Sequence, residues 1–475
     1  MEKLVDIIGG GLAGSEAALQ LASRGLRVRL IEMRPGVQTA VHETGDFAEL
    51  VCSNSLKSMK SESAAGMLKT ELEALGSQVF AAARACAVPA GGALAVDRQQ
   101  FAAQVSAAIN AHPAIEIIRA QALAIDAAGR VCIAACPNSA PAPLEGLASA
   151  IIVASGPLTA DALAENLQQL TGADHLAFYD AAAPIVMADS LDTAKLFTQS
   201  RYEDEGTGDY LNAPFSREEY DAFIEALLGA QRVIAKEFET RDLFQACQPI
   251  EEIARKGHDA PRFGTLKPVG LTDPLTGRRP WAALQLRAEN AAKTSYNLVG
   301  FQTNLTFPEQ RRVFGMIPGL AHAQFARFGV MHRNTFIDAP HVLDAQLRLR
   351  SAASAKLPVP VFVAGQLAGT EGYCEAIASG LFAALAVAAQ LDDVALPLLP
   401  ADTAFGALLA YARDASVKDY QPMHVNFGIM APLEVPVKNK RDRYAAYAQR
   451  GRCALQNYCA QLQTSGLLPQ GGQSL

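Results

Sequence analysis

The sequence lacks the features that mark membrane and exported proteins. No apolar run reaches the roughly 18 residues needed to span a bilayer, and the long candidate from Leu381 to Leu391 is rich in alanine and indicates a buried helix. The first residues, Met1 to Lys3, lead directly into an apolar strand, without the hydrophobic region or cleavage site of a signal peptide. We therefore expect neither a membrane span nor export.

Clustered cysteines are also absent. The eight cysteines are scattered, at positions 52, 86, 132, 136, 247, 374, 453 and 459. They contain no CxxC pair, and no histidine stands at the spacing of a zinc site, so we expect no bound metal. Unpaired thiols are typical of a reducing compartment, which favours a cytoplasmic protein.

Positively charged residues are outnumbered, because the chain has 41 Lys and Arg against 48 Asp and Glu, and its net charge is −7. This balance argues against a protein that coats nucleic acid non-specifically, because such binding needs clustered cations. One dense basic run remains, with Lys438, Lys440, Arg441 and Arg443. It is either a local RNA-binding patch or the solvated start of a helix, and both interpretations stay open. The oligomeric state stays open as well.

What the sequence does contain begins with a strand-helix-strand unit. Residues 4–8 form a short apolar run, residues 13–24 carry apolar side chains at helical spacing, and residues 26–31 indicate a second strand. The 475 residues are 50% hydrophobic, enough for a large core and for two or three domains. From about residue 188 aromatic and charged residues increase, which suggests an inserted domain.

The turn of this unit is Gly9-Gly10-Gly11-Leu12-Ala13-Gly14, which fits G-x-G-x-x-G directly after a strand and before a helix. Glycines at this position let the backbone approach a pyrophosphate, and the helix N-terminus supplies N–H groups and partial positive charge. Glu32 ends the second strand, where a carboxylate accepts hydrogen bonds from an adenosine ribose. We predict these seven residues as contacts of a dinucleotide cofactor.

A second glycine-rich turn, with Gly365 and Gly372, follows an apolar strand and precedes an alanine-rich helix that ends near Ala389. This return favours FAD over NAD, because such a segment lies against the flavin in flavoproteins. We therefore predict an α/β protein with a Rossmann-like FAD-binding domain of the glutathione-reductase type and an inserted α+β domain. The predicted boundaries are 1–187 and 341–435 for the FAD-binding domain, 188–340 for the insertion, and 436–475 for a basic helix with a frayed tail.

Five further segments resemble the folate- and FAD-dependent tRNA (uracil-5-)-methyltransferases of bacteria, and the likeness extends from Gly9 to about Leu433. These segments are VCSNSL at 51–56, PAGGALAVDR at 89–98, YDAAAPIV at 179–186, KPVGL at 267–271 and MHRNT at 331–335. The resemblance implies transfer of a one-carbon unit from methylenetetrahydrofolate to C5 of the uridine at position 54 of the tRNA T-loop. It also implies FAD that is reduced by NADH or NADPH.

The resemblance implies two catalytic cysteines, which map to Cys52 and Cys247. C5 of uracil is a poor nucleophile until a thiolate adds to C6, so covalent catalysis is expected for this chemistry. We predict that Cys247 attacks C6 and that Cys52 works beside the flavin, where it handles the methylene group or protects the nucleophile. The reversed assignment and a plain core thiol at position 247 stay open.

Three residues are predicted to line the folate or uridine site. His332 lies in the MHRNT segment and either stacks on the pterin ring or is a hydrogen-bonded core histidine. Arg287 and Asn304 lie in the segments LQLR and GFQTN, which also resemble the family. The chain departs from the family pattern at Thr370, at Cys374 and at His424, which replaces an asparagine and leaves the contacts of its segment open.

Four other functions stay open. The chain is also compatible with the flavoprotein subunit of the tRNA wobble-uridine carboxymethylaminomethyl complex, although those chains are usually much longer. A uridine methyltransferase acting on ribosomal RNA would use the same chemistry. An ordinary flavin oxidoreductase for a small molecule would not need Cys247 or a basic C-terminal segment. A flavin-stabilised RNA-binding protein without catalysis is the remaining alternative.

Overall fold

The computed structural model describes most of the chain. The described residues are 3–39, 41–136, 139–172, 176–201, 208–234, 248–350, 357–417 and 420–469, and the side chains of residues 176–180, 332 and 333 lie outside the description.

A five-stranded parallel sheet forms the centre of the cofactor domain, in the order β19-β10-β1-β2-β6. The strands are β1 (Leu4–Ile8), β2 (Arg27–Glu32), β6 (Ile115–Arg119), β10 (Ala150–Val153) and β19 (Val361–Val363). β10 is buried along its whole length, as expected for a parallel strand covered on both faces. β19 returns to this sheet from late in the chain, so the predicted Rossmann-like fold with a return segment is confirmed.

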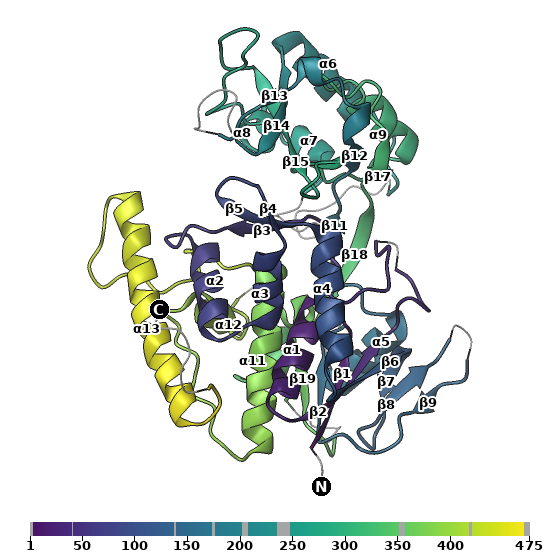
Figure 1. Ribbon diagram of the computed structural model, residues 1–475, viewed down its shortest axis with the longest axis vertical. Helices are drawn as coiled ribbons and strands as arrows, with labels where there is room; N and C mark the ends of the chain where they lie inside the picture. The colour runs from purple at the N-terminus through teal and green to yellow at the C-terminus, as the bar shows by residue number, and fades with distance from the viewer. Residues whose placement is uncertain are drawn as a thin grey trace.

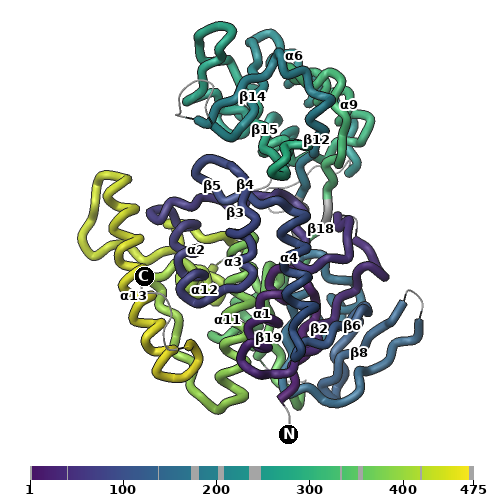
Figure 2. The backbone as a smooth tube through the Cα atoms, viewed as in Figure 1, coloured from purple at the N-terminus to yellow at the C-terminus, as the bar shows by residue number. Residues whose placement is uncertain are grey.

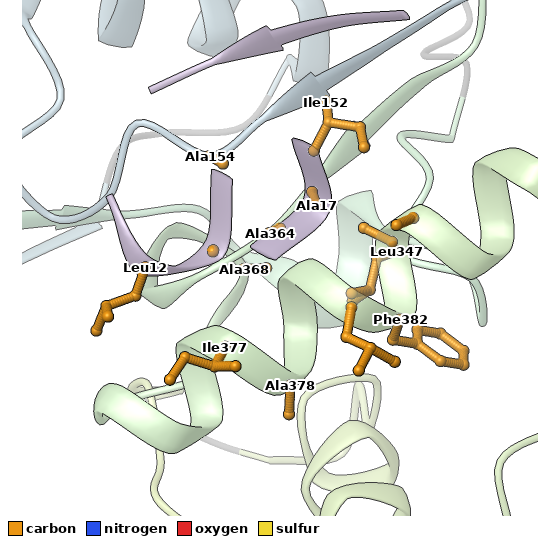
Figure 3. Close-up of a cluster of buried hydrophobic side chains, with 14 of the residues drawn as sticks. Leu12, Ala17, Ile152, Ala154, Leu347, Ala364, Ala368, Ile377, Ala378 and Phe382 are labelled. Atoms are coloured by element: carbon orange, nitrogen blue, oxygen red, sulfur yellow. The ribbon is translucent and has the colours of Figure 1, made fainter. Parts of the chain in front are cut away.

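Two close-packed helices, α1 (Leu12–Ser23) and α11 (Tyr373–Leu391), lie together against this sheet. A Cβ atom at Gly380 would lie 2.1 Å from the carbonyl oxygen of Ala13, so this crossing requires a residue without a side chain. Figure 3 shows buried hydrophobic side chains at and around this contact, among them Ala17 of α1 and Ile377 of α11. α11 is long and apolar enough to cross a membrane, but 83% of its most apolar window is buried, which identifies a core helix.

The remaining helices and small sheets complete the cofactor domain (Figure 1). The helices are α2 (Ala64–Ala74), α3 (Gln78–Ala85), α4 (Arg98–Ala111), α5 (Asp161–Thr171), α10 (Ala339–Val342), α12 (Ala404–Tyr411) and α13 (Lys440–Thr464). One small antiparallel sheet contains β3 (Ser55–Ser58), β5 (Ala93–Val96) and β4 (Ala87–Val88), and the other contains β7 (Gln121–Ile125), β8 (Val131–Ala134) and β9 (Ala142–Pro143).

The inserted domain has its own antiparallel sheet and its own hydrophobic core. The strands, in sheet order, are β13 (Phe197–Thr198), β14 (Tyr210–Phe215), β15 (Ala282–Ala288), β16 (Ser295–Leu298), β12 (Ile185–Met187) and β17 (Phe325–Arg327). The helices are α6 (Arg217–Leu228), α7 (Ile250–Arg255), α8 (Ala260–Phe263) and α9 (Phe307–Phe314). An antiparallel pair, β11 (Leu176–Ala181) and β18 (Met331–Phe336), connects the two domains.

The structure moves two predicted boundaries. β12 already belongs to the inserted sheet, so the insertion begins before residue 188, and its last strand, β17, ends before residue 340. The local pattern at residues 185–187 does not reveal this pairing, because its partner strands lie more than 100 residues later. The tube in Figure 2 shows the chain leaving and re-entering the cofactor domain beside β18.

The tail at the end of the predicted segment 436–475 is not frayed at residues 465–469, contrary to the prediction. Leu467 and Leu468 are buried, and the Leu467 amide donates to the carbonyl of Leu462 at 2.9 Å. The Arg24 guanidinium also donates to the carbonyl of Leu467 at 3.1 Å. These apolar side chains hold the end of α13 against the domain. The free energy gained by burying them outweighs the tendency of the surrounding glycine and polar residues to stay in solvent.

Candidate active site

An open cavity of about 1270 Å³ lies where β1, β2 and β10 end, between the first glycine turn and the return turn. Ligands of parallel α/β sheets bind at this edge. Eight of the predicted site residues line it together: Gly9, Gly11, Leu12, Ala13, Glu32, Cys52, Gly365 and Gly372. The structure thus brings the predicted cofactor residues and one predicted catalytic cysteine into one site.

The glycines of the first turn have different tasks. Gly11 faces open space, since a Cβ atom there would meet no atom within 4 Å, and it lines the cavity. Gly14 allows close packing, because a Cβ atom there would lie 1.8 Å from the carbonyl oxygen of Gly9. Gly9 itself has φ +102°, in the region that favours glycine. A pyrophosphate fits this cradle, because the start of α1 carries no side-chain cap among the described residues.

Glu32 presents an ionised carboxylate at the cavity wall. It accepts hydrogen bonds from the Gly10 amide at 2.7 Å and from the Arg34 side chain at 2.8 Å. Burial raises the pKa of Glu32, but the hydrogen bonds from Arg34 and Gly10 outweigh burial and hold the pKa below its usual value. A carboxylate has further lone pairs, so it can still accept from a ribose. Gly10 and Gly14 lie behind the wall, where they serve packing.

The return turn is built on glycines with positive φ, +78° at Gly365 and +115° at Gly372. The segment around His424, whose contacts the sequence left open, pairs with this turn. The Met423 amide donates to the Gly369 carbonyl, and the Glu371 amide donates to the Met423 carbonyl, both at 3.0 Å. The segment therefore fixes the turn that faces the cavity.

Cys52 is half-buried at the cavity, and its thiol lies 3.8 Å from the carbonyl oxygen of Ala181. The backbone amides of Cys52 and Ser53 both donate to the phenol oxygen of Tyr373 at 3.0 Å. Burial, together with the neighbouring Cys52, raises the pKa of Tyr373, so the phenol stays neutral. Tyr373, at the start of α11, therefore holds the backbone of residues 50–54, which we call the Cys52 loop.

Arg287 reaches the same loop from the inserted domain. Its guanidinium donates to the Asn54 side-chain oxygen at 2.6 Å and to the Ser53 hydroxyl at 2.8 Å. The Asn54 amide in turn donates to the carbonyls of Val96 and Ala288, each at 3.0 Å. Arg287 is buried, and it connects strand β15 with the residues that follow Cys52. The structure thus places this predicted site residue behind the residues that carry Cys52.

Two arginines lie near Cys52. Arg98 and Arg327 are close enough to interact electrostatically with it. Arg98 also donates to the Leu50 carbonyl at 2.9 Å and pairs with Glu289 at 2.5 Å. Arg327 is paired as well, with Glu43 at 3.7 Å, and neither arginine lines the cavity, so both charges are largely balanced behind its wall.

Two predicted residues lie partly or wholly outside the described residues. Cys247 belongs to residues 235–247, which the structure does not describe. The backbone of His332 lies in β18 and pairs with Asp180 of β11, next to Ala181, whose carbonyl contacts Cys52. The His332 side chain is outside the description.

Asn304 serves the protein backbone. Its side-chain amide accepts from the Ile234 amide at 3.1 Å and donates to the Ile234 carbonyl at 2.9 Å. Its backbone amide donates to the Glu251 carboxylate at 2.5 Å. Residue 234 precedes and residue 251 follows the segment with Cys247, so Asn304 ties together the two ends of that segment.

The predicted basic patch lies at the start of α13. Lys438, Lys440 and Arg441 are exposed, while Arg443 is half-buried and donates to the Val437 carbonyl at 3.3 Å. Asn439 caps the helix by accepting from the amide of Arg441 at 2.8 Å. These contacts are those of a solvated helix start that also presents three exposed cationic side chains.

Comparison with known proteins decides the family. The family described as Glucose inhibited division protein A matches residues 4–395. A relative from Geobacter sulfurreducens, Methylenetetrahydrofolate--tRNA-(uracil-5-)-methyltransferase TrmFO, is 50% identical over 97% of this chain and 100% of its own length. A relative of the same name from Listeria monocytogenes is 46% identical over the same shares of both chains. This chain belongs to that methyltransferase family.

A solved structure supports the fold. Aquifex aeolicus GidA in its form I crystal has a TM-score of 0.70 and 15% identity, over 99% of this chain and 77% of that chain. At this identity the likeness concerns the fold alone. The wobble-uridine alternative is not favoured, because the highly similar relatives carry the methyltransferase name and match this chain from end to end.

Several site residues escaped the sequence analysis. Tyr373 and Arg98 stand inside motifs that were recognised, but nothing in a motif tells which backbone atoms a side chain will hold. His42 lines the cavity, and burial together with Arg34 lowers its pKa to about 4, so the ring is neutral at physiological pH. No spacing pattern pointed to it. Among the described residues, no group of three or more His, Cys, Asp or Glu side chains is placed to hold a metal.

Proposed function

We propose that this protein methylates C5 of the uridine at position 54 of the tRNA T-loop. Methylenetetrahydrofolate is the one-carbon donor, and FAD reduced by NADH or NADPH supplies the electrons. The observation that carries the proposal is the cavity that Cys52 shares with glycines of the two turns. Two relatives that match nearly the whole chain are named for this activity. We propose the cytoplasm as its location.

The cavity residues fit FAD. Gly11 and the start of α1 would face the pyrophosphate, Glu32 would accept from the adenosine ribose, and Gly365 and Gly372 would face the flavin. When bound, FAD supplies the electrons that bring the methylene carbon to the methyl level. Tyr373, at the same wall, holds Cys52 beside this position through two backbone amides.

The steps that we assign to the protein's own residues are thiolate addition and proton transfer. The Cys247 thiolate adds to C6 of uracil, which forms a C–S bond and moves an electron pair onto C5. C5 then bonds to the one-carbon unit. Loss of the C5 proton then breaks the bond between that carbon and the folate nitrogen, which keeps the electron pair. Two electrons and a proton, which bound reduced FAD would supply, complete the methyl group, restore the C5–C6 double bond and expel the thiolate. Cys52, held beside the flavin by Tyr373, handles the methylene group or protects the nucleophile.

Three residues support these steps in the proposal. Arg287 positions the Cys52 loop from the side of the inserted domain, and Asn304 positions the ends of the Cys247 segment. His332, on the strand that pairs beside Ala181, stacks on the pterin ring of the folate.

Lys438, Lys440, Arg441 and Arg443 bind RNA phosphates in this proposal. Replacing all four by glutamine should weaken tRNA binding and lower its dependence on salt. Unchanged affinity and an unchanged salt slope would leave the patch as a solvated helix start.

The reaction itself is tested with purified protein, methylenetetrahydrofolate, NADH or NADPH, and unmodified tRNA transcript. Nucleoside mass spectrometry should detect 5-methyluridine, and a transcript with cytidine at position 54 should remain unmethylated. Flavin-loaded protein that forms no 5-methyluridine in tRNA would contradict the proposal. Methylation of a ribosomal RNA transcript instead would favour the ribosomal alternative.

A further inference from the structure

A second hollow, of about 1060 Å³, lies on the inserted domain and has no assigned role. It is formed by the start of α6, helix α8 and the chain that leads into β15, in the upper part of the molecule in Figure 1. Its lining combines four cations with two aromatic rings: Arg217, Arg262, Lys267, Arg279, Phe263 and Trp281. We call this hollow the arginine–tryptophan groove.

The groove keeps a positive charge in a chain whose net charge is −7. Arg217 lies 3.8 Å from Asp221 and Arg262 lies 3.5 Å from Asp259, so these two cations are partly balanced. Lys267 and Arg279 form no ion pair with any carboxylate in the part of the chain that the structure describes. Within the described residues, the groove therefore offers two cations without an acidic partner.

The groove also contains a platform for stacking. The Arg262 guanidinium lies 3.5 Å from the ring centroid of Trp281, which is the only tryptophan of the chain. The indole nitrogen of Trp281 is buried and has no hydrogen-bond partner among the described residues. Phe263 is 81% exposed, which is unusual for a ring of this size. Aromatic rings and arginine planes are the groups on which unpaired bases stack.

We propose that the arginine–tryptophan groove binds the phosphate backbone and an unpaired base of the tRNA substrate. This inference rests on the proposed function, since it names a second contact of the same RNA. Strand β15 connects the two places. It begins directly after Trp281 and carries Arg287, which donates to Ser53 beside Cys52. At about 3.4 Å per residue, the strand spans roughly 20 Å between them, a distance that a few nucleotides bridge.

A nicotinamide dinucleotide fits the groove less well. Its ring would have to reach the flavin in the first cavity while its phosphates stay at the far end of β15. An RNA strand can occupy both places at once. Its phosphate charge repeats along the strand, and its target uridine lies apart from the nucleotides that bind the groove.

The test uses the flavin-loaded protein and an unmodified tRNA transcript. Lys267 and Arg279 are replaced together by glutamine, which leaves no described carboxylate without its ion-pair partner. The matched control replaces Arg348 and Arg350, two exposed arginines of the cofactor domain, by glutamine. Trp281 fluorescence reports binding directly, because it is the only tryptophan.

In the wild type, tRNA should quench Trp281 and protect it from acrylamide. The Lys267 and Arg279 variant should bind about tenfold more weakly, and its slope of log affinity against log salt should fall by about 1 to 2. Its KM for tRNA should rise while kcat at saturating tRNA, flavin content and melting temperature stay unchanged. The control should match the wild type in all of these.

Two results would overturn the inference. One is an affinity within twofold of wild type with the same salt slope, together with no protection of wild-type Trp281 from acrylamide. The other is a raised KM for NADPH with an unchanged KM for tRNA, which would assign the groove to the reductant. A wild-type protein that forms no 5-methyluridine would contradict the proposed function instead, and this result is read before any variant is made.

Discussion

At the scale of single residues, Gly11 carries the most direct prediction. Its missing side chain opens onto the cavity, so Gly11→Val would fill the space that we propose for a pyrophosphate. We expect the purified variant to lose its yellow colour while its fold persists. Gly257→Val is the matched control, because a Cβ atom there also meets nothing within 4 Å but lies outside the cavity. Full flavin occupancy in Gly11→Val, measured by absorbance, would contradict the assignment.

Tyr373 allows a second test at this scale. Tyr373→Phe removes the oxygen that accepts from the amides of Cys52 and Ser53. Losing the partner of a buried donor costs about 1–3 kcal/mol, and these two donors are partly buried, so we expect methylation to slow by about tenfold while flavin stays bound. Tyr411→Phe is the control, since its hydroxyl donates to the Gln421 carbonyl outside the cavity. Equal rates for both variants would show that the Cys52 loop does not depend on Tyr373.

At the scale of elements, buried carboxylates hold chain segments together. Glu251 accepts from Asn304 and Thr303, and Glu71 accepts from the first amides of α12. Burial raises the pKa of each to about 7. Because the folded state binds these protons more tightly than the unfolded state, the stability that they contribute is complete below about pH 4.5 and is lost as the pH rises through 7.

The consequence is a measurable pH dependence. The free energy of unfolding of the wild type should fall between pH 5 and pH 8. In Glu251→Gln this fall should be smaller by up to about 3 kcal/mol, which is the free-energy equivalent of a pKa shift of two to three units. Denaturant titrations at several pH values measure this difference. The exposed Glu218→Gln is the control. A steeper loss in Glu251→Gln than in the wild type would reverse the sign and contradict the account.

Elements also show which parts of the fold are predictable. The strand-helix-strand unit, its glycine turn and the return at 361–391 follow from local periodicity, and all three appear in the structure. The pairing of β12 with β16 and β17 does not follow from local periodicity, because it joins parts of the chain that lie more than 100 residues apart in the sequence. Arg287 was predicted to line the substrate site, but its contact with Ser53 joins two domains, and no local pattern encodes such a contact.

At the scale of the whole molecule, the cofactor domain and the inserted domain meet around Cys52. The Cys52 loop is held by Tyr373 from α11, by Arg98 from α4 and by Arg287 from β15 of the inserted domain. Residues of both domains therefore determine the position of this loop. The fold and the cofactor cavity were predictable from motifs, whereas this convergence of three elements on one loop required the structure.

The central claim is that a cysteine of this protein attacks the target uridine, and a tRNA that carries 5-fluorouridine at position 54 tests it most directly. Since C5 then has no proton to lose, the covalent adduct should persist. Wild-type protein should give a denaturation-stable protein–RNA band that Cys247→Ala lacks while its flavin stays bound. A band that survives in Cys247→Ala and vanishes in Cys52→Ala would reverse the two roles. A band that survives both substitutions would contradict cysteine catalysis in this protein.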